Sequence, residues 1–440
     1  MTLDLLRFTT AGSVDDGKST LIGRLLYDSK QVFEDQLAQV AQASERRGGS
    51  GTLDLALLTD GLRAEREQGI TIDVAYRYFA TARRRFIIAD CPGHRQYTRN
   101  MVTGASTADV AVVLIDARKG VLEQSKRHAF ISALLGIPQM VVAINKMDLV
   151  DYSQARYEEL VEEFEAFARK LRGGKNPRRT ETSYVPMSAL KGDNVVERSS
   201  RMDWYDGPVL LEMLEQVEVA YDHPDERPAR FPVQWVIRPA NTVGAVAGTG
   251  AAAGVGDPLD YRGYAGQLAS GALRLGDEVA VLPAGTRTRI AGIDTYDGEL
   301  EEALAPMSLT LRLEDELDVS RGELICHPDE APVVARALEA DVCWMAEHPL
   351  RAGSRYVLKH TSRQATAVVD AIDDLVEVHT LERVAPPQQL ELNDIGRVRL
   401  RTSAPLVFDP YTQNRRTGSF ILIDQDSNGT VGAGIIGAPA

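Results

Sequence analysis

A glycine-rich segment near the N-terminus combines the residue types that bind phosphate. It matches the spacing Gly-x-x-x-x-Gly-Lys-Ser/Thr and lies between an apolar run and a helical pattern, as a phosphate-binding loop must. Its glycines allow backbone N–H groups to turn toward a phosphate, and the N-terminus of the following helix favours an anion. The residues expected to contact a nucleotide here are Gly12, Ser13, Val14, Asp15, Asp16, Gly17, Lys18, Ser19 and Thr20.

Lys18 and Ser19 have the most specific expected roles in this loop. We expect the Lys18 ammonium to meet the β- and γ-phosphates and the Ser19 hydroxyl to coordinate Mg²⁺. A single short motif can also be a chance glycine-rich turn, so the prediction depends on further motifs in the right order.

A second motif predicts which base the nucleotide carries. Asn145, Lys146 and Asp148 come directly after an apolar run. Guanine presents two donors, at N1 and at its exocyclic amine, and the carboxylate of Asp148 can accept both. Adenine lacks this pair and would leave the buried carboxylate unsatisfied, which is a strong form of discrimination. We expect Asn145 to brace the loop and Lys146 to lie along the base.

A partner loop for the guanine carbonyl is expected after the next apolar run, at Ser188, Ala189 and Leu190. As an isolated tripeptide it is equally consistent with the small-residue end of a strand. Its position relative to the other motifs is what favours a role in base binding.

A third motif, between the other two, reads Asp90, Cys91, Pro92, Gly93 and His94. We expect Asp90 to hold Mg²⁺ through water and the Gly93 amide to meet the γ-phosphate. His94 is the candidate for orienting the attacking water. A histidine after a glycine is commonly a turn residue, but its position two residues after Pro92 favours the catalytic interpretation.

Thr71, in the stretch 69–72, is the fourth candidate. Its hydroxyl can bind Mg²⁺ and its amide the γ-phosphate, so that the segment is ordered only with a triphosphate bound. Ile-Thr-Ile alone is equally a plain β-strand. Four motifs in this order predict a GTP-binding, GTP-hydrolysing protein, with His94, Lys18 and Thr71 as the residues that act in hydrolysis.

These motifs need a scaffold that brings several strand ends together. The first two hundred residues alternate apolar runs with helical patterns, which predicts a doubly wound, mostly parallel α/β sheet of the phosphate-loop GTPase type. The expected strands cover residues 5–11, 86–90, 110–116, 140–145 and 184–188, and the expected helices 18–27, 122–135, 157–171 and 209–217.

The rest of the chain has a different texture. After a proline-rich acidic linker at 222–228, short alternating segments with Gly-Asp and Asp-Gly turns predict β-barrels. The first predicted barrel has strands at 266–275, 277–282, 287–296 and 307–313, and the second at 340–345, 355–360, 364–372, 396–402 and 419–424. We therefore expect an α/β GTP-binding domain at 1–222 and all-β barrel domains at 229–328 and 332–438.

Two stretches fit neither pattern. Residues 240–257 are rich in Gly, Ala and Val and are expected to form a mobile insertion in the first barrel domain. The segment 46–51 lies in a connection before Gly69 that is too long for a passive loop, so we expect this connection to be functional.

Composition limits the remaining classes of function. A net charge of −14 and a pI of about 5.1 argue weakly against a partner that is nucleic acid. No secretory signal and no apolar run long enough to span a membrane is apparent. The three cysteines, Cys91, Cys326 and Cys343, form no paired motif, which argues against a zinc site or a disulfide framework. This cysteine usage is typical of a protein in the reducing cytoplasm.

The motifs and their surroundings resemble the translational GTPases, and among these the large GTPase subunits of bacterial ATP sulfurylase. The resemblance extends from about residue 8 to the C-terminus and is densest at 12–28, 58–73, 96–109 and 143–152. It implies a GTPase domain followed by two barrels, with GTP and Mg²⁺ as ligands. It also implies a separate small subunit that makes adenylyl sulfate from ATP and sulfate, while this chain couples GTP hydrolysis to that reaction.

Elongation factors that deliver aminoacyl-tRNA are the nearest alternative, and a scaffold GTPase without coupled activity is another. Asp16 where those factors usually have His, Gln68 where they usually have Arg, and Ala189-Leu190 in place of Gly-Trp favour the sulfurylase subunit. Arg95 stands where the sulfurylase subunits usually have Glu. Cys91 replaces the more usual Thr as in elongation factors, so it does not distinguish the two families. Some relatives carry a C-terminal adenylyl-sulfate kinase domain, an activity that we expect this chain to lack.

Overall fold

The computed structural model describes residues 4–30, 40, 55–58, 71, 73–94, 97–173, 180–218, 227–238, 261–378 and 380–439. The chain divides into two compact units, Met1–Val219 with Val376–Arg383 and Ala220–Leu375 with Val384–Ala440. Several expectations lie outside the described residues: the segment 46–51, Gln68, Gly69, Arg95 and the insertion 240–257.

A six-stranded sheet forms the centre of the first unit, with the order β2-β3-β1-β4-β5-β6. Five strands are parallel, and β2 pairs antiparallel with β3 at the edge. The strands are β1 (Asp4–Ala11), β2 (Ala75–Ala80), β3 (Arg84–Asp90), β4 (Val110–Asp116), β5 (Gln139–Asn145) and β6 (Glu181–Pro186). Every residue of β4 is buried, as expected for a central parallel strand covered on both faces.

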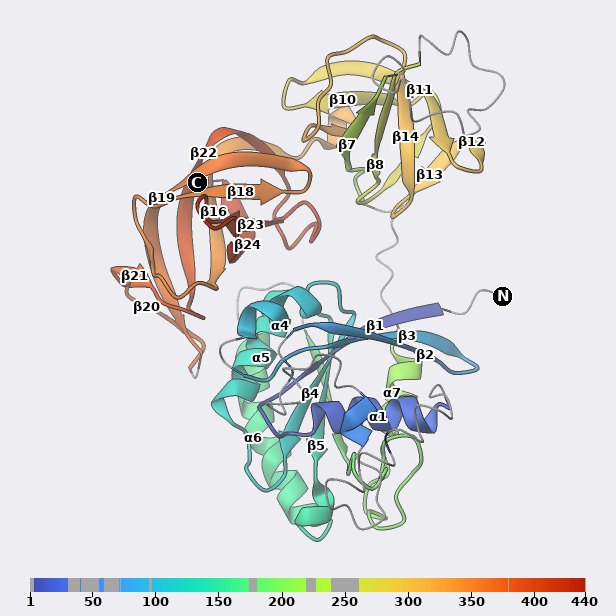
Figure 1. Cartoon of the computed structure of the whole chain (residues 1–440), viewed down its shortest axis with the longest axis vertical. Helices are drawn as coiled ribbons and strands as arrows, with labels where there is room; N and C mark the ends of the chain where they lie inside the picture. The colour runs from blue at the N-terminus through green and yellow to red at the C-terminus, as the bar shows by residue number, and fades with distance from the viewer. Residues whose placement is uncertain are drawn as a thin grey trace. The chain divides into compact units, whose positions relative to one another are not determined.

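Helices cover both faces of this sheet (Figure 1), with α4, α5 and α6 on one side and α1 and α7 on the other. Their bounds are α1 (Lys18–Asp28), α4 (Thr98–Ala105), α5 (Glu123–Leu134), α6 (Gln154–Gly173) and α7 (Leu210–Gln216), with short 3-10 turns η1 (Leu55–Leu58) and η3 (Met147–Leu149). The prediction of a doubly wound α/β domain is therefore confirmed.

The first barrel of the second unit closes six strands in the order β10-β15-β7-β8-β14-β11, with β10 pairing back to β11. These strands are β7 (Phe231–Ile237), β8 (Gly263–Gln267), β10 (Glu278–Leu282), β11 (Thr286–Thr295), β14 (Ser308–Leu313) and β15 (Leu324–Cys326). Smaller strands β9 (Ala272–Arg274), β12 (Gly298–Leu300) and β13 (Glu302–Leu304) flank them. Phe231, Tyr264 and Leu311 are among the residues that fill the interior.

A continuous strand over 266–275 was expected here, and this prediction is wrong. The chain turns at Gly271, whose φ is +75°, so β8 ends before it and β9 begins after it. A Cβ at Gly271 would stand 2.4 Å from the Ala229 Cα, so both the backbone angle and the close approach require glycine.

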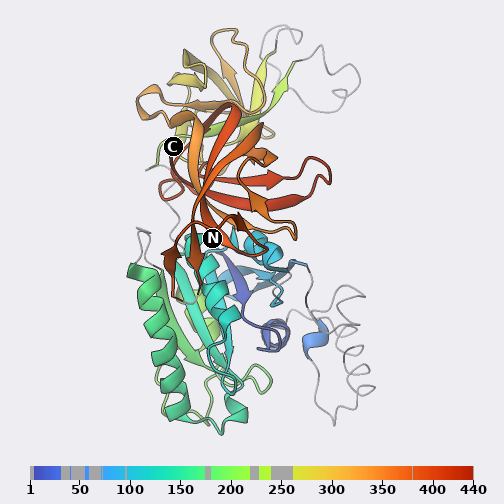
Figure 2. The ribbon, with the colours of Figure 1, turned by 90° about the vertical axis from the view of Figure 1, so that its left-hand side faces the viewer.

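The second barrel, coloured orange to red in Figure 2, also closes six strands. Their order is β18-β23-β24-β16-β22-β19, with β18 pairing to β19. Its strands are β16 (Val333–Trp344), β18 (Arg355–His360), β19 (Arg363–Glu377), β22 (Ile395–Phe408), β23 (Ser419–Ile423) and β24 (Thr430–Pro439), with β17 (Leu350–Arg351), β20 (Glu382–Val384) and β21 (Gln389–Leu390) as short additions. A 3-10 turn, η7 (Pro328–Glu330), precedes β16 near the predicted boundary. The proposed domain limits themselves stay a prediction.

A buried ion pair joins the two barrels within the second unit. The Arg230 guanidinium, just before β7, donates two 2.9 Å hydrogen bonds to the Asp409 carboxylate, just after β22. Both side chains are less than a tenth exposed, and Thr417 donates a further bond of 2.6 Å to Asp409. Breaking such a pair leaves an uncompensated buried charge, so it fixes the two barrels to each other.

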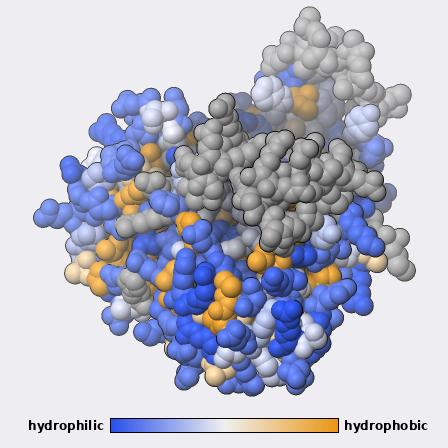
Figure 3. All heavy atoms as spheres, turned by 60° about the horizontal axis from the view of Figure 1, so that its bottom comes forward, coloured by the Kyte–Doolittle hydropathy of each residue, from blue (hydrophilic) through white to orange (hydrophobic). Residues whose placement is uncertain are grey.

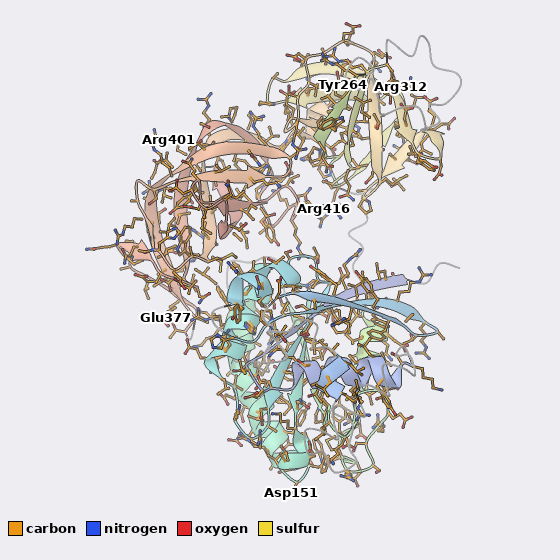
Figure 4. All side chains as sticks on the ribbon, in the orientation of Figure 1. Asp151, Tyr264, Arg312, Glu377, Arg401 and Arg416 are labelled. Atoms are coloured by element: carbon orange, nitrogen blue, oxygen red, sulfur yellow. The ribbon has the colours of Figure 1, made fainter. Side chains whose placement is uncertain are left out.

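One face of the molecule is largely polar where its residues are described. Figure 3 shows one face on which hydrophilic residues predominate and small hydrophobic spots are interspersed. On the second barrel, Arg401 of β22 points outward (Figure 4) and pairs with Asp370 across 3.1 Å. Within the described ranges, no helix has the length and apolar character that crossing a membrane requires.

Candidate nucleotide-binding site

The predicted phosphate loop connects β1 to α1. Three of its residues have positive φ: Gly12 at +137°, Asp15 at +67° and Gly17 at +95°. A Cβ at Gly12 would stand 2.7 Å from the Leu114 carbonyl oxygen, so the loop needs glycine there. Gly17 is the N-cap of α1, and no side chain caps the helix. Its first N–H groups are therefore left for an anion, as a phosphate site requires.

Lys18 lies inside this loop. Its ammonium donates to the carbonyls of Gly12, across 3.2 Å, and of Ser13, across 2.7 Å. The side chain is buried, and this burial lowers the pKa of the ammonium despite the neighbouring carboxylates of Asp16 and Asp90. Lys18 therefore places its ammonium inside the loop, and its contact with the β- and γ-phosphates stays a prediction.

Asp16 supports the loop's own backbone. Its Oδ2 accepts the Ser13 N–H across 2.6 Å, and the side chain is almost fully buried. Burial raises the pKa of this carboxyl, with Lys18 acting in the opposite direction. The Asp16 carboxylate therefore holds the phosphate loop in its conformation, and the direct nucleotide contact of Asp16 stays a prediction.

Three segments far apart in the sequence meet at the predicted guanine site. Asn145, at the end of β5, donates to the Asp16 carbonyl across 2.7 Å and accepts the Ala189 N–H across 2.9 Å. Ser188 donates its hydroxyl to Asp148 Oδ1 across 2.7 Å. The phosphate loop, the Asn145–Asp148 loop and the Ser188–Leu190 loop are therefore held together by side-chain contacts, and Asn145 has its predicted bracing role.

Lys146 is held by a residue that the sequence did not reveal. Its ammonium lies 2.9 Å from Asp116 Oδ2 and also donates to the Asp15 carbonyl. Asp116 is fully buried at the end of β4 and accepts two bonds from the Arg118 guanidinium, at 3.1 and 2.7 Å. Burial alone would raise the pKa of Asp116, but the hydrogen bonds from Arg118 and Lys146 hold it well below its usual range. Asp116 therefore stays ionised and orients the Lys146 ammonium.

His128 is a second residue that sequence reasoning missed. It is fully buried on α5, and its Nδ1 accepts the Gly12 N–H across 3.0 Å. Because Nδ1 accepts, the neutral ring carries its proton on Nε2, and the Gln124 amide, whose nitrogen lies 2.9 Å from Nε2, must present its oxygen there to accept that proton. Burial, together with Lys18, lowers the pKa of His128 to about 3. No sequence signal identifies this contact, since a histidine in a helix usually has no link to a loop 116 residues away.

The Asp90–His94 segment lies against the same loop. Asp90 is buried at the end of β3 and accepts the Thr10 hydroxyl across 3.4 Å. A Cβ at Gly93 would stand 2.4 Å from Lys18 Nζ and 2.9 Å from the Gly12 carbonyl oxygen. His94 is half-buried, and its ring centroid lies 5.9 Å from that of Tyr97. Gly93 is thus as close to the phosphate loop as its predicted role requires.

The remaining predicted residues have less defined surroundings. Val14, Ser19, Thr20 and Thr71 are partly buried, and Leu190 is 46% exposed. Thr71 lies outside any helix or strand. Its proposed contact with Mg²⁺ and the γ-phosphate remains a prediction.

The donor set fits a nucleoside triphosphate with Mg²⁺. The uncapped N-terminus of α1 and the Lys18 ammonium suit phosphate oxygens, and the Ser19 hydroxyl and Asp90 carboxylate are hard oxygen donors of the type that Mg²⁺ prefers. The Asp148 carboxylate, fixed through one oxygen by Ser188, suits the two donors of guanine.

Family models agree with this geometry. Residues 3–220 match the Elongation factor Tu GTP binding domain, and residues 337–437 match the GTP-eEF1A C-terminal domain-like family. A GTP-binding domain and a barrel of the elongation-factor type are therefore both present in the chain.

Two relatives match almost the whole chain. "Bifunctional enzyme CysN/CysC" of Mycobacterium tuberculosis is 54% identical over 433 residues, covering 98% of this chain and 67% of the relative. "Sulfate adenylyltransferase subunit 1" of Citrobacter koseri is 52% identical over 436 residues, covering 99% and 86%. Among solved structures, sup35 complexed with GMPPNP covers 100% of this chain and 95% of its own at 23% identity and a TM-score of 0.43.

Proposed function

The chain belongs to the family of sulfate adenylyltransferase subunit 1, and from this premise we propose that it hydrolyses GTP to drive the synthesis of adenylyl sulfate from ATP and sulfate. The observation that carries the proposal is an identity of 52–54% to members of that family over nearly the whole chain. The alternative of an aminoacyl-tRNA carrier has no comparable support, because the elongation-factor models match the GTP-binding domain and the last barrel separately, whereas the relatives named for sulfate adenylyltransferase match nearly the whole chain.

The chain's own residues account for GTP binding. The Lys18 ammonium and the N–H groups at the start of α1 neutralise phosphate charge. Asp148, held by Ser188, accepts the guanine donors, while Asn145 keeps the base-binding and phosphate-binding loops in register. We further propose that Leu190 donates its backbone N–H to the guanine carbonyl, because the Ala189 N–H is already donated to Asn145.

Hydrolysis is proposed to use the residues next to the γ-phosphate position. When bound, Mg²⁺ supplies positive charge to the phosphate oxygens, and the residues that would hold it are Ser19, Thr71 and Asp90. Gly93 donates its N–H to the γ-phosphate, and His94 orients the attacking water. The close approach of Gly93 to Lys18 supports this assignment.

Coupling requires a partner. We propose a small adenylyltransferase subunit that carries out the transfer of the adenylyl group to sulfate, with this chain as the GTP-dependent subunit of a heterodimer. Contact of Thr71 with the γ-phosphate, which exists only in the triphosphate state, would change the contacts with that partner, which is a population shift driven by differential binding. The three buried free thiols support a reducing, cytoplasmic location.

GTP turnover measured with and without the small subunit, ATP and sulfate tests the proposal. We expect slow hydrolysis and no adenylyl sulfate from the chain alone, and both GTP turnover and adenylyl sulfate when all components are present. Robust adenylyl sulfate synthesis by the chain alone would contradict the division of labour. Co-purification with aminoacyl-tRNA in place of a small nucleotidyltransferase would instead favour an elongation factor.

A further inference from the structure

Arg24 is a half-buried residue in the middle of α1, and the motifs that define the nucleotide site do not include it. Its guanidinium points at the base-binding loop. Nε donates to the Ala189 carbonyl across 3.2 Å, and Nη2 donates to the Leu190 carbonyl across 2.7 Å. The side chain is 18% exposed and also contacts Asp28 across 3.4 Å. One side chain therefore ties two consecutive carbonyls of the loop to the helix that begins with Lys18 and Ser19.

The hydrogen bond from Arg24 to the Leu190 carbonyl is linked to the Asp148 carboxylate by two further hydrogen bonds. In a trans peptide the carbonyl and the next N–H point in opposite directions, so fixing the Leu190 carbonyl also fixes the Lys191 N–H. That N–H donates to Ser188 Oγ across 3.2 Å, and Ser188 in turn donates to Asp148 Oδ1 across 2.7 Å. The result is a continuous series of hydrogen bonds from Arg24 to Asp148.

The bond to Ala189 acts on the neighbouring peptide. Fixing the Ala189 carbonyl toward α1 turns the Leu190 N–H to the opposite side of that peptide plane. The Ala189 N–H is already held by Asn145. Both peptides of the loop thus have defined orientations, and the guanidinium, with donors in a fixed planar fork, is suited to holding two carbonyls at once.

We propose that Arg24 is a positioning residue for guanine selectivity, which sets the orientation of the Ser188–Leu190 loop and, through Ser188, of the Asp148 carboxylate. This inference rests on the proposed binding of GTP. The proposed role concerns recognition of the base and not of the phosphates, because Arg24 contacts the base-binding loop and not the phosphate loop. Removing Arg24 should therefore weaken guanine recognition more than it weakens the rest of nucleotide binding.

Arg84 offers a matched control in the same unit. Its guanidinium donates to two backbone carbonyls, those of Leu214 at 3.0 Å and Val217 at 2.6 Å, and to the Asp4 carboxylate at 2.6 Å. These are the same kinds of contact that Arg24 makes, but none involves the base-binding loop. Arg84→Met therefore measures the general cost of removing such an arginine. Arg24 also borders an open pocket of about 530 Å³, so a methionine there meets no crowding.

The test compares affinities for GTP and inosine triphosphate, which lacks the exocyclic amine that Asp148 accepts. For Arg24→Met we expect the Kd for GTP to rise about tenfold, the loss typical of one hydrogen bond to a charged group, with a smaller change for inosine triphosphate. The GTP preference should shrink, kcat at saturating GTP should be unchanged, and Arg24→Lys should restore part of the preference. Arg84→Met should leave the preference intact.

A double variant distinguishes a positioning role from general damage. Because Arg24 and Ser188 act in one series of hydrogen bonds, Ser188→Ala should reduce the GTP preference far less in the Arg24→Met background than in the wild type. Equal losses for GTP and inosine triphosphate, or additive effects of the two changes, would overturn the role of Arg24. A wild type with no GTP preference would instead overturn the proposed function, and the role of Arg24 with it.

Discussion

Ser188 and Asp148 lie 40 residues apart in the sequence, and the serine hydroxyl donates to Oδ1 of the aspartate across 2.7 Å. The bond joins the loop after β6 to the loop after β5, so the carboxylate is held in one orientation before any base arrives. A carboxylate fixed in this way can still accept hydrogen bonds from a ligand, and little free energy is lost in ordering it when the ligand binds.

Asp148→Asn should shift the nucleotide preference from GTP to xanthosine triphosphate. The amide offers one donor and one acceptor, which suits a base that carries an oxygen in place of the guanine amine, whereas guanine would face an unpaired donor. We expect the Kd for GTP to rise and that for xanthosine triphosphate to fall, as measured by equilibrium binding of both nucleotides.

Asp151→Asn is the matched control for this change. Asp151 is exposed near the start of α6 (Figure 4), and its φ of +53° is one that asparagine adopts readily. The control should retain GTP selectivity. Full GTP selectivity in Asp148→Asn itself would show that the guanine site has been assigned to the wrong loop.

Gly93→Ala should impair the response to the γ-phosphate. The added Cβ would stand 2.9 Å from the Gly12 carbonyl oxygen, which is backbone and moves only if the phosphate loop moves. We expect affinity for GTP to fall more than affinity for GDP, and stimulated GTP hydrolysis to fall at least tenfold, about 1.4 kcal/mol in the barrier. Gly437→Ala is the control, because its Cβ meets only an ordinary contact of 3.8 Å. Equal affinity changes for GTP and GDP would contradict a γ-phosphate role.

From the lowered pKa of His128 we expect the free energy of unfolding to decrease at acidic pH. Burial lowers its pKa in the folded chain to about 3, from 6.5 in the unfolded chain, so between these values the unfolded state binds more protons. This contribution is absent above pH 6.5 and grows as the pH falls below it. From pH 6.5, where the unfolded imidazole is already half protonated, to pH 5.0 the free energy of unfolding should decrease by about 1.5 kcal/mol on this account.

Urea unfolding of wild type and His128→Gln at the two pH values measures this contribution. A glutamine oxygen can still accept the Gly12 N–H but does not titrate, so the variant should lose less stability on acidification. Other groups, such as the buried His360, whose pKa is also lowered by burial, titrate equally in both proteins and cancel in the comparison. An identical pH dependence in the two proteins would contradict the prediction.

The local sequence pattern correctly predicted elements whose residues carry a clear hydrophobic pattern of their own. The strand over 110–116 matches β4 residue for residue, because a fully buried parallel strand is a continuous apolar run. The edge strand β2 was not predicted, since its residues are mostly half-exposed or exposed and it is stabilised by pairing with β3. Strand β24 was missed for a similar reason. Its Gly- and Ala-rich sequence has low strand propensity, and pairing on both sides holds it in place.

In the candidate site, too, residues that depend on tertiary contacts could not be predicted from the local sequence. Lys18, Asn145 and Asp148 were predictable because their spacing is local and belongs to known motifs. His128, Asp116 and Arg24 were not, because each acts through a tertiary contact with a loop distant in sequence. Such contacts depend on which helix packs beside which loop, and no local pattern encodes this. The residues that sequence reasoning missed are those that position the motif residues.

Lys18→Ala should weaken nucleotide binding as well as turnover. Lys18 is the buried cation within the loop, and it is proposed to contact the phosphates already in the ground state. We therefore expect a large rise in the Kd for both GTP and GDP by equilibrium binding. Unchanged affinity would remove Lys18 from the phosphate site.

His94→Ala should separate binding from chemistry. If His94 only orients water, it acts mainly in the transition state, so GTP affinity should be retained while stimulated hydrolysis falls by about 10²–10³, or ~3–4 kcal/mol. The deficit should be largest in the presence of the small subunit, ATP and sulfate, because hydrolysis is then fast enough for the chemical step to limit the rate, and the yield of adenylyl sulfate should fall with it. Binding and stimulated hydrolysis are measured in one preparation, with Tyr97→Phe as control, because it retains the aromatic ring beside His94. Normal stimulated hydrolysis in His94→Ala would exclude His94 from the mechanism, and lost affinity would assign it a structural role instead.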